Sequence, residues 1–132
     1  MLSDDEIFEG VRNKEFITDD RVVVIRDLQL NTPLHFMALY HNVLHHGQLS
    51  NIVNMLGETP LHWMASRNLL AIQHNDIASV KDKFGNSPLH WAASVFGERV
   101  LWHPDLKRTL NSKGLTPFDY IEFKPCSYIA QE

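Results

Sequence analysis

Apolar and polar positions follow the same order four times along the chain. In each copy a Thr or Ser precedes a Pro, an apolar residue, a polar residue and an aromatic residue. The copies begin at Thr32, Thr59, Ser87 and Thr116, which lie 27, 28 and 29 residues apart. One pattern recurring at nearly constant spacing predicts a chain built from similar structural units.

Each copy carries the signals of a helix start. Ser and Thr hydroxyls cap the free amide groups at a helix N-terminus, and Pro suits the first helical position. The apolar residue after Pro shares a helix face with the alanine four residues later, and we expect that face to be buried. These pairs are Leu34 with Ala38, Leu61 with Ala65, and Leu89 with Ala93, while the last copy has Phe118 without an alanine.

A tight turn is predicted just before each helix. Five residues before the cap lies an Asp or Asn, at Asp27, Asn54, Asp82 and Asn111. Two residues before the cap lies Gly57, Gly85 or Gly114, and glycine permits the positive φ of such turns. Leu30 takes this place in the first copy, so we expect the first turn to be altered.

The remaining elements are predicted to be short. Gly47, Asn75 and Pro104 lie where a second helix should end, which leaves second helices at about 42–46, 68–74 and 97–103. Ser3 and Glu6 match a capping box, so we expect a helix over about 4–12 and a short one near 14–18. A last helix over 116–123 should stop at Pro125. The tail beyond it has three readings: an improvised cap, a disordered end, or the edge of a longer protein.

The recurring segments resemble the ankyrin repeat, which joins a β-turn, a T-P-L-H-x-A helix start and a second, antiparallel helix. The resemblance covers roughly residues 20–122, although the family repeat of about 33 residues is longer. It implies an all-α solenoid of stacked helix-turn-helix units with hairpin tips, in one domain over 1–132. The units would be an irregular capping repeat at 1–26, repeats at 27–53, 54–81 and 82–110, and a partial repeat with a tail at 111–132.

Composition narrows the classes of partner and compartment. A net charge of −4 over 132 residues disfavours nucleic acids and anionic membranes, because both require a basic face. The single cysteine, Cys126, cannot form an internal disulfide, and the N-terminus lacks a secretory signal, so we expect a reducing cytoplasm. Some divergent ankyrin proteins are effectors delivered into host cells, so the resemblance also implies delivery into a host cell if this chain is an effector.

Signatures of enzyme chemistry are absent from the sequence, which has no G-x-S-x-G, P-loop, H-E-x-x-H or G-x-G-x-x-G motif. We therefore expect no enzyme activity, no cofactor and no metal. The alternative is a metal or small-ligand site at His41, His45 and His46, because His41 and His45 lie one helical turn apart.

The other recurring polar and aromatic positions are expected to be structural. His35, His62 and His90 should hydrogen-bond to the backbone between adjacent turns. Phe36, Trp63, Trp91 and Tyr120 should pack between consecutive hairpins rather than form a ligand box.

The resemblance implies a protein-interaction module that binds a folded partner through its turn tips and the concave face of its first helices. Such a module acts as an inhibitor, scaffold, adaptor or effector. Leu28, Met55, Leu56, Phe84 and Leu115 are apolar at tip positions expected to be exposed, unless neighbouring tips cover one another. The predicted partner-binding residues are Leu28, Gln29, Asn31, Tyr40, Met55, Leu56, Glu58, Arg67, Lys83, Phe84, Asn86, Val95, Ser112, Lys113 and Leu115.

Two further expectations concern assembly. The chain is expected to be a monomer whose C-terminal face is available for self-association. A recognition domain of a larger enzyme is a second alternative for its role.

Overall fold

The computed structural model describes residues 3–41, 43 and 46–121. Within these residues the chain consists of helices and loops and contains no β-strand, so the predicted all-helical class is confirmed. The α-helices are α1 (Asp4–Arg12), α2 (Pro33–Tyr40), α3 (Pro60–Ala65) and α4 (Pro88–Phe96), and the 3-10 helices are η1 (Asp20–Val23), η2 (Leu69–Gln73), η3 (Gly97–Val100) and η4 (Pro117–Tyr120). No helix in the described ranges has the length and apolar character needed to cross a membrane.

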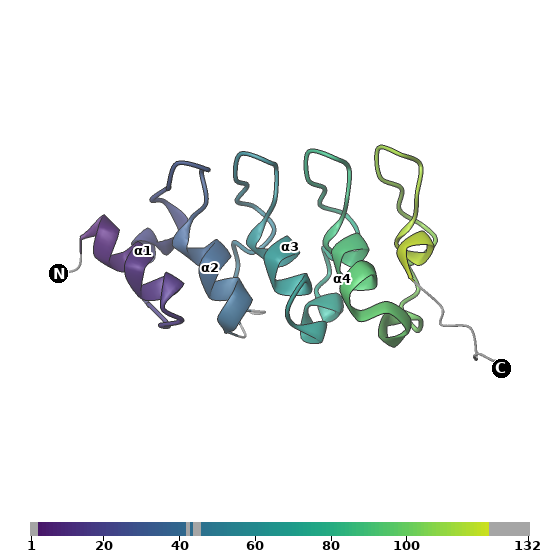
Figure 1. The fold of residues 1–132 in the computed structure, drawn as a ribbon, viewed down its shortest axis with the longest axis horizontal. Helices are drawn as coiled ribbons and strands as arrows, with labels where there is room; N and C mark the ends of the chain where they lie inside the picture. Colours follow the sequence, from purple (N-terminus) through teal and green to yellow (C-terminus); the bar gives the residue numbers. More distant parts are fainter. Residues whose placement is uncertain (1–2, 42, 44–45, 122–132) are drawn as a thin grey trace, which may run out of the picture.

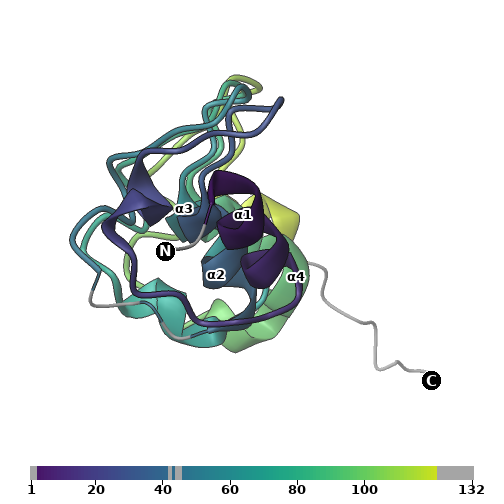
Figure 2. The ribbon, with the colours of Figure 1, turned by 90° about the vertical axis from the view of Figure 1, so that its left-hand side faces the viewer.

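The helices stand side by side in the order of the chain (Figure 1). Helix α1 packs against α2, α2 against α3, α3 against α4, and α4 against η4. A long loop before each of α2, α3, α4 and η4 projects from one edge of this row, and the loops overlie one another when the row is seen from its end (Figure 2). The molecule therefore has an edge made only of loop ends.

Local capping explains where the helices begin. Pro33, Pro60 and Pro88 each occupy the first helical position, as the sequence predicts. The Thr59 hydroxyl accepts a hydrogen bond from the His62 N–H at 3.2 Å. Helix α1 begins with the expected capping box of Ser3 and Glu6 and covers the predicted range. These starts are fixed by residues within one turn of the helix.

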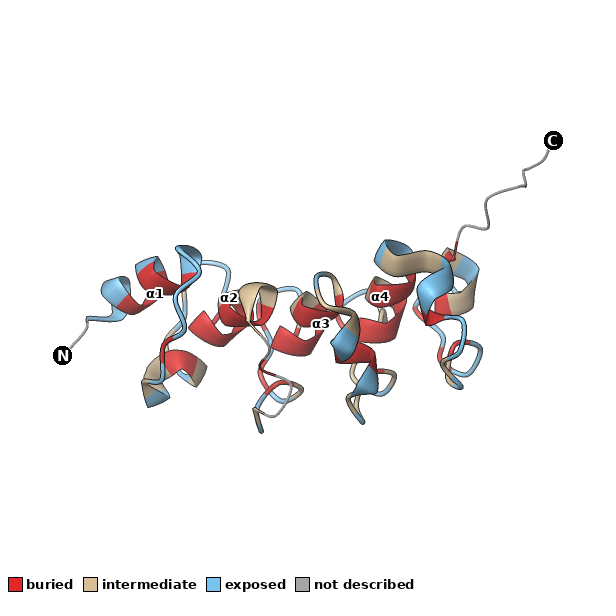
Figure 3. Cartoon of the chain, turned by 90° about the horizontal axis from the view of Figure 1, so that it is seen from below, coloured by how far each residue is buried: buried red, intermediate tan, exposed pale blue. Residues whose placement is uncertain are grey.

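The buried faces of the helices form one continuous apolar core (Figure 3). Leu34, Leu61 and Leu89 have no exposed surface, and Ala65 and Ala93 are equally buried. A leucine at each junction fills the space between neighbours, while the alanine one turn later lets the helices approach closely. The predicted inward face of these helices is confirmed.

The second layer of elements is shorter than predicted and is 3-10 rather than α-helical. Helix η2 packs against α3 and α4, and η3 packs against α4, in the segments expected to be helical at 68–74 and 97–103. Four or five residues give too few α-type hydrogen bonds to close an α-helix, whereas a 3-10 turn needs fewer. Most of the third predicted segment, 42–46, lies outside the described residues.

The predictions for the two ends were partly wrong. Residues 14–18 are not helical, and the helical turn lies later, at η1. The Asp19 carboxylate accepts from the Arg21 N–H and binds the Arg21 guanidinium, so the cap at Asp19 decides where the turn begins. The predicted helix at 116–123 is reduced to η4, while Pro125, Cys126 and the tail lie outside the described residues.

Four tip turns, at 27–31, 54–58, 82–86 and 111–115, share one hydrogen-bond pattern. In each, the side-chain oxygen of the first residue accepts from the backbone N–H groups two and four residues later. Leu30 has φ 64°, close to the 76° of Gly57 in the second turn. The expected alteration of the first turn is therefore wrong, because Leu30 adopts the left-handed conformation that glycine takes in the other turns.

Backbone hydrogen bonds join each tip turn to the next. The Met55 N–H donates to the Gln29 carbonyl at 2.9 Å, the Lys83 N–H to the Leu56 carbonyl at 2.7 Å, and the Ser112 N–H to the Phe84 carbonyl at 3.0 Å. The turns come so close that a Cβ on Gly85 would lie 2.6 Å from the Ser112 nitrogen, whereas a Cβ on Gly114 would meet nothing within 4 Å.

This contrast predicts unequal costs for two similar substitutions. Gly114→Ala should lower the free energy of unfolding by about 1 kcal/mol, the cost of a left-handed non-glycine residue. Gly85→Ala should cost about 2–4 kcal/mol, because overpacking against the next turn adds to the backbone strain. Urea denaturation of both variants measures the difference, and equal losses would show that the turns are not in close contact.

Leu30→Gly should stabilise the protein. Removing a leucine from the left-handed conformation stabilises the folded state by about 1–2 kcal/mol. The greater conformational entropy of glycine stabilises the unfolded chain by about 0.5–1 kcal/mol and so offsets part of this gain. A net gain of roughly 0.5 kcal/mol is expected in urea denaturation. Leu30→Ala is the control, since it shortens the side chain but keeps the strain, and it should bring no gain. A loss of stability in Leu30→Gly would contradict this account.

Candidate interaction surface

The tip turns carry apolar side chains that lie in solvent. Leu28 is 89% exposed, Met55 59%, Leu56 41% and Phe84 57%. We call these four residues the apolar tip row. They come from three consecutive tip turns, which the backbone bonds described above hold in line. Neighbouring tips therefore do not cover one another, and the prediction of exposure is confirmed for these four.

The fifth residue of each tip turn was expected at the surface but is buried or half-buried. Asn31 is buried, and its side-chain oxygen accepts from Asn54 Nδ2 at 2.8 Å. Asn86 is half-buried and accepts from Asn111 Nδ2 at 2.8 Å. The prediction of Asn31 as an exposed contact residue was wrong, because this turn position faces the neighbouring turn.

Two other members of the predicted set are only partly exposed. The half-buried Glu58 carboxylate accepts from Asn54 Nδ2 and from Trp63 Nε1. Leu115 is half-buried, which corrects its prediction as an exposed apolar tip. Its N–H donates to the Asn111 side chain and its carbonyl lies 2.9 Å from His90 Nε2, so the last turn is drawn toward α4.

The rest of the predicted surface divides into two groups. Gln29, Lys83, Ser112 and Lys113 are exposed on the tip turns. Tyr40, Arg67 and Val95 lie instead at or beside the far ends of α2, α3 and α4. An α-helix rises about 1.5 Å per residue, so α2 alone places roughly 12 Å between Tyr40 and the tips.

Tyr40 and Arg67 come together at that far end. The Arg67 guanidinium lies 5.9 Å from the centre of the Tyr40 ring, and the Lys14 ammonium lies 5.3 Å from it. Val95 is exposed on α4. The structure thus gathers Tyr40 and Arg67 into one cation–aromatic contact but keeps them apart from the apolar tip row.

Three buried histidines fix the position of the tip turns. The Thr59 N–H donates to His62 Nδ1 at 3.1 Å, so the ring proton sits on Nε2, which donates to the Asn86 carbonyl at 2.8 Å. His35 makes the same bond to the Glu58 carbonyl, and His90 to the Leu115 carbonyl. Each histidine caps its own helix and holds the following tip turn, as the sequence predicts.

These rings are held in the neutral form. Burial lowers the pKa of His35 to about 4 and also lowers the pKa of His62 and of His90. Protonation would place a hydrogen on Nδ1, where the ring now accepts a backbone N–H. The charged form therefore loses both its hydration and its capping bond.

Folding stability should consequently fall on mild acidification. The pKa of these groups is depressed in the folded state, so the unfolded chain binds more protons between pH 6.5 and about 4, and stability present above pH 6.5 is lost as the pH drops through that window. His35 alone accounts for on the order of 2 kcal/mol at about pH 5. Urea denaturation at about pH 7.5 and pH 5 tests this.

His35→Gln provides the comparison for the pH experiment. The variant should be less stable at neutral pH, but its stability should depend less steeply on pH because one titrating group is removed. An unchanged slope in His35→Gln would rule out His35 as a source of the acid sensitivity.

Aromatic rings line the helices below the tips. The ring centres of Phe8 and Phe36 lie 6.3 Å apart, and those of Phe36 and Trp63 lie 5.3 Å apart, both edge to face. Trp91 packs in the same way against His62, and Tyr120 against His90. The expected packing between consecutive units is confirmed.

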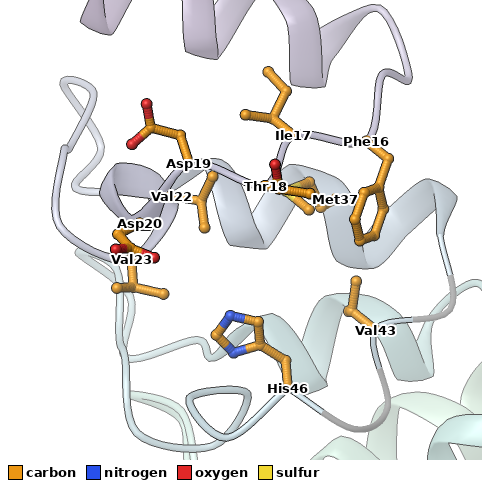
Figure 4. Close-up of a pocket in the computed structure, with 10 residues that line it drawn as sticks. All are labelled: Phe16, Ile17, Thr18, Asp19, Asp20, Val22, Val23, Met37, Val43 and His46. Carbon is orange, nitrogen blue, oxygen red and sulfur yellow. The ribbon is translucent and has the colours of Figure 1, made fainter.

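The sequence did not predict a hollow that is lined by residues 16–20, 22, 23, 37, 43 and 46 (Figure 4). Its volume is about 540 Å³, and it lies between the segment 16–23, which contains η1, and residues 43 and 46, which follow α2. Its walls are mainly apolar, from Ile17, Val22, Met37 and Val43, and His46 lies at one side. The hollow depends on how three separate segments meet, so no local motif marks it.

The histidine cluster is not gathered into a site within the described residues. His41 Nε2 lies 2.7 Å from the Lys14 carbonyl, and its ring packs edge to face on Phe16. His46 Nδ1 accepts from the Gln48 N–H, while His45 lies outside the described residues. Among the residues the structure describes, no three His, Cys, Asp or Glu side chains are grouped to hold a metal ion.

Comparison with known proteins identifies no relative of this chain. The chain matches no known family model and no curated protein. The regular surface feature that remains is the tip edge with its apolar row.

Residues beside the tips also escaped the sequence analysis. Arg26, Val53, Lys81 and Leu110 directly precede the four tip turns, and all four are exposed. The signal was present, because each stands immediately before the recurring Asp or Asn. Each of them therefore adds exposed surface next to its tip turn in the chain.

Proposed function

We propose that this protein is a non-enzymatic interaction module that binds a folded protein partner along its tip turns. The apolar tip row carries the proposal. Leu28, Met55, Leu56 and Phe84 are large, exposed and arranged in order on successive turns. Burying a side chain of this kind contributes about 1.5–3 kcal/mol, so a few of them suffice to anchor a complex.

The rigidity of the turns supports binding over incidental exposure. Side-chain oxygens hold each turn from inside, and backbone bonds join neighbouring turns. A surface already fixed in shape loses little conformational entropy when a partner docks, which favours affinity. The backbone that carries the exposed apolar side chains therefore keeps one conformation.

The proposed architecture is a short solenoid of ankyrin-like units. Its support is the recurrence, in each copy, of a tip turn, a Pro-started helix and a histidine or aspartate that closes the cap. Units that contact mainly their neighbours in the chain also fit a solenoid. In this proposal the far-end residues Tyr40, Arg67 and Val95 are secondary contacts. The module acts as an inhibitor, scaffold, adaptor or effector, without a cofactor.

Replacing two members of the apolar tip row tests the proposal. The double variant Leu56→Ala with Phe84→Ala should lose a partner that the wild type captures from extracts of the cells that contain it. Quantitative mass spectrometry of the captured proteins measures the loss. The free energy of unfolding should change by less than about 1 kcal/mol, because Leu56 is already 41% and Phe84 57% exposed in the folded protein.

Two controls separate binding from folding. Leu70→Ala with Trp102→Ala removes exposed apolar side chains away from the tips and should leave capture unchanged. Leu61→Ala removes a fully buried side chain and should cost about 2–5 kcal/mol. The proposal fails if no captured protein depends on Leu56 and Phe84, or if the tip variant unfolds as readily as Leu61→Ala.

A further inference from the structure

Exposed charge on the tip edge is positive, although the chain carries a net charge of −4. We consider the segments 26–31, 53–58, 81–86 and 110–115, which are the tip turns with the residue before each. The cations Arg26, Lys81, Lys83 and Lys113 are all exposed. The acids Asp27, Glu58 and Asp82 are buried or half-buried, and their oxygens accept hydrogen bonds from within the molecule.

Among the residues that the structure describes, none of these four cations forms an ion pair with a carboxylate. The Arg26 guanidinium donates to the Leu30 and Val53 carbonyls, and the Lys81 ammonium donates to the Leu110 carbonyl at 2.7 Å. Within the described residues, no carboxylate forms an ion pair with Lys83 or Lys113. Asp82 offsets one of the two lysines of segment 81–86, so an approaching partner meets a net charge of about +1 on each of the third and fourth segments.

The two kinds of side chain are unevenly distributed along the edge. The first two tip turns supply Leu28, Met55 and Leu56, and segment 53–58 contains no cation. Near the first turn the acids Asp4 and Asp5 of α1 share a hollow with Arg26, which offsets its charge. The edge thus has an apolar half followed by a basic half, with Phe84 between Lys83 and Lys113.

We propose, resting on the interaction function proposed above, that the partner presents an acidic segment that also carries apolar side chains. Its apolar side chains cover the first two tip turns, and its carboxylates pair with Lys83, Lys113 and Lys81. Charge complementarity sets the orientation of the partner on the edge and speeds its association, while the buried apolar side chains supply the affinity.

The composition of the edge favours a protein over a nucleic acid. Unpaired bases bind by stacking on aromatic rings, and Phe84 is the single aromatic residue in the four segments. Leucine and methionine side chains offer no stacking surface, but they pack well against apolar side chains. The acidic remainder of the molecule would also repel a long phosphate chain.

A selection experiment with defined components tests the inference. A library of one small folded domain with a randomised surface loop is displayed on phage and selected against the immobilised chain. Loops that bind should be enriched in Asp and Glu together with apolar residues. Their binding should weaken on the order of tenfold in the variant Lys83→Glu with Lys113→Glu, and their binding to the unchanged chain should weaken as salt is raised to ~0.5 M.

A matched variant and a charge swap isolate the contact. Lys107→Glu with Arg108→Glu changes the net charge by the same amount outside the four segments and should leave the affinity within about twofold. Replacing the acidic residues of a selected loop by Lys should restore binding to the Lys83→Glu, Lys113→Glu variant. Rescue of this kind requires direct pairing, because a variant that had merely unfolded would not recover.

The possible failures are distinguishable. Enrichment of neutral or basic loops that still require Leu56 and Phe84 would overturn the acidic partner and leave the interaction function standing. Selected loops that bind equally well to the Leu56→Ala, Phe84→Ala variant would overturn the function itself. Tight binding of a uridine homopolymer RNA that is lost in Lys83→Glu with Lys113→Glu would overturn the inference in favour of nucleic acid.

Discussion

The hydrogen bond from a buried histidine to the next tip turn is the interaction on which the rest depends. In His62 one ring nitrogen closes the start of its own helix, and the other holds the Asn86 carbonyl of the following turn. A single side chain thus couples the geometry within one unit to the spacing between two. The bond that Nδ1 accepts from the Thr59 N–H needs the neutral ring, so the burial that lowers the pKa of His62 is part of the same arrangement.

Because other groups fix the tip turns, the exposed tip side chains are not needed to stabilise the fold. The turns are fixed by Asp and Asn oxygens, by backbone bonds and by the histidines, so Leu28 or Phe84 can point into solvent without loosening the fold. A binding surface assembled in this way can be apolar and still well ordered. Its specificity then rests on the few side chains that differ from turn to turn.

Local signals explain how much could be predicted from the sequence. The caps at Ser3, Thr59 and Ser87 act within a few residues, and so the starts of α1, α3 and α4 were predicted correctly. The turn at η1 was misplaced, because the Asp19 side chain caps its start and lies just after the predicted segment 14–18.

Contacts between units were harder to foresee. The burial of Asn31, the half-buried state of Leu115 and the hollow beside His46 depend on neighbours more than twenty residues away or on several segments meeting. Repetition compensates in part, since the aromatic and histidine contacts recur at each junction and were expected from their spacing. The exposed cations before the tips had a sequence signal that becomes meaningful only once the edge is seen in three dimensions.

The connection from each helix to the following turn varies in length, yet the bonds from Gln29 to Met55, Leu56 to Lys83 and Phe84 to Ser112 keep the same pairing. These backbone bonds therefore set the spacing of the tip turns independently of the length of the connections. Insertions or deletions in the connections would not change that spacing. Side chains on a single tip turn can therefore change during evolution without altering the connections, and the connections can change without altering the tip turns.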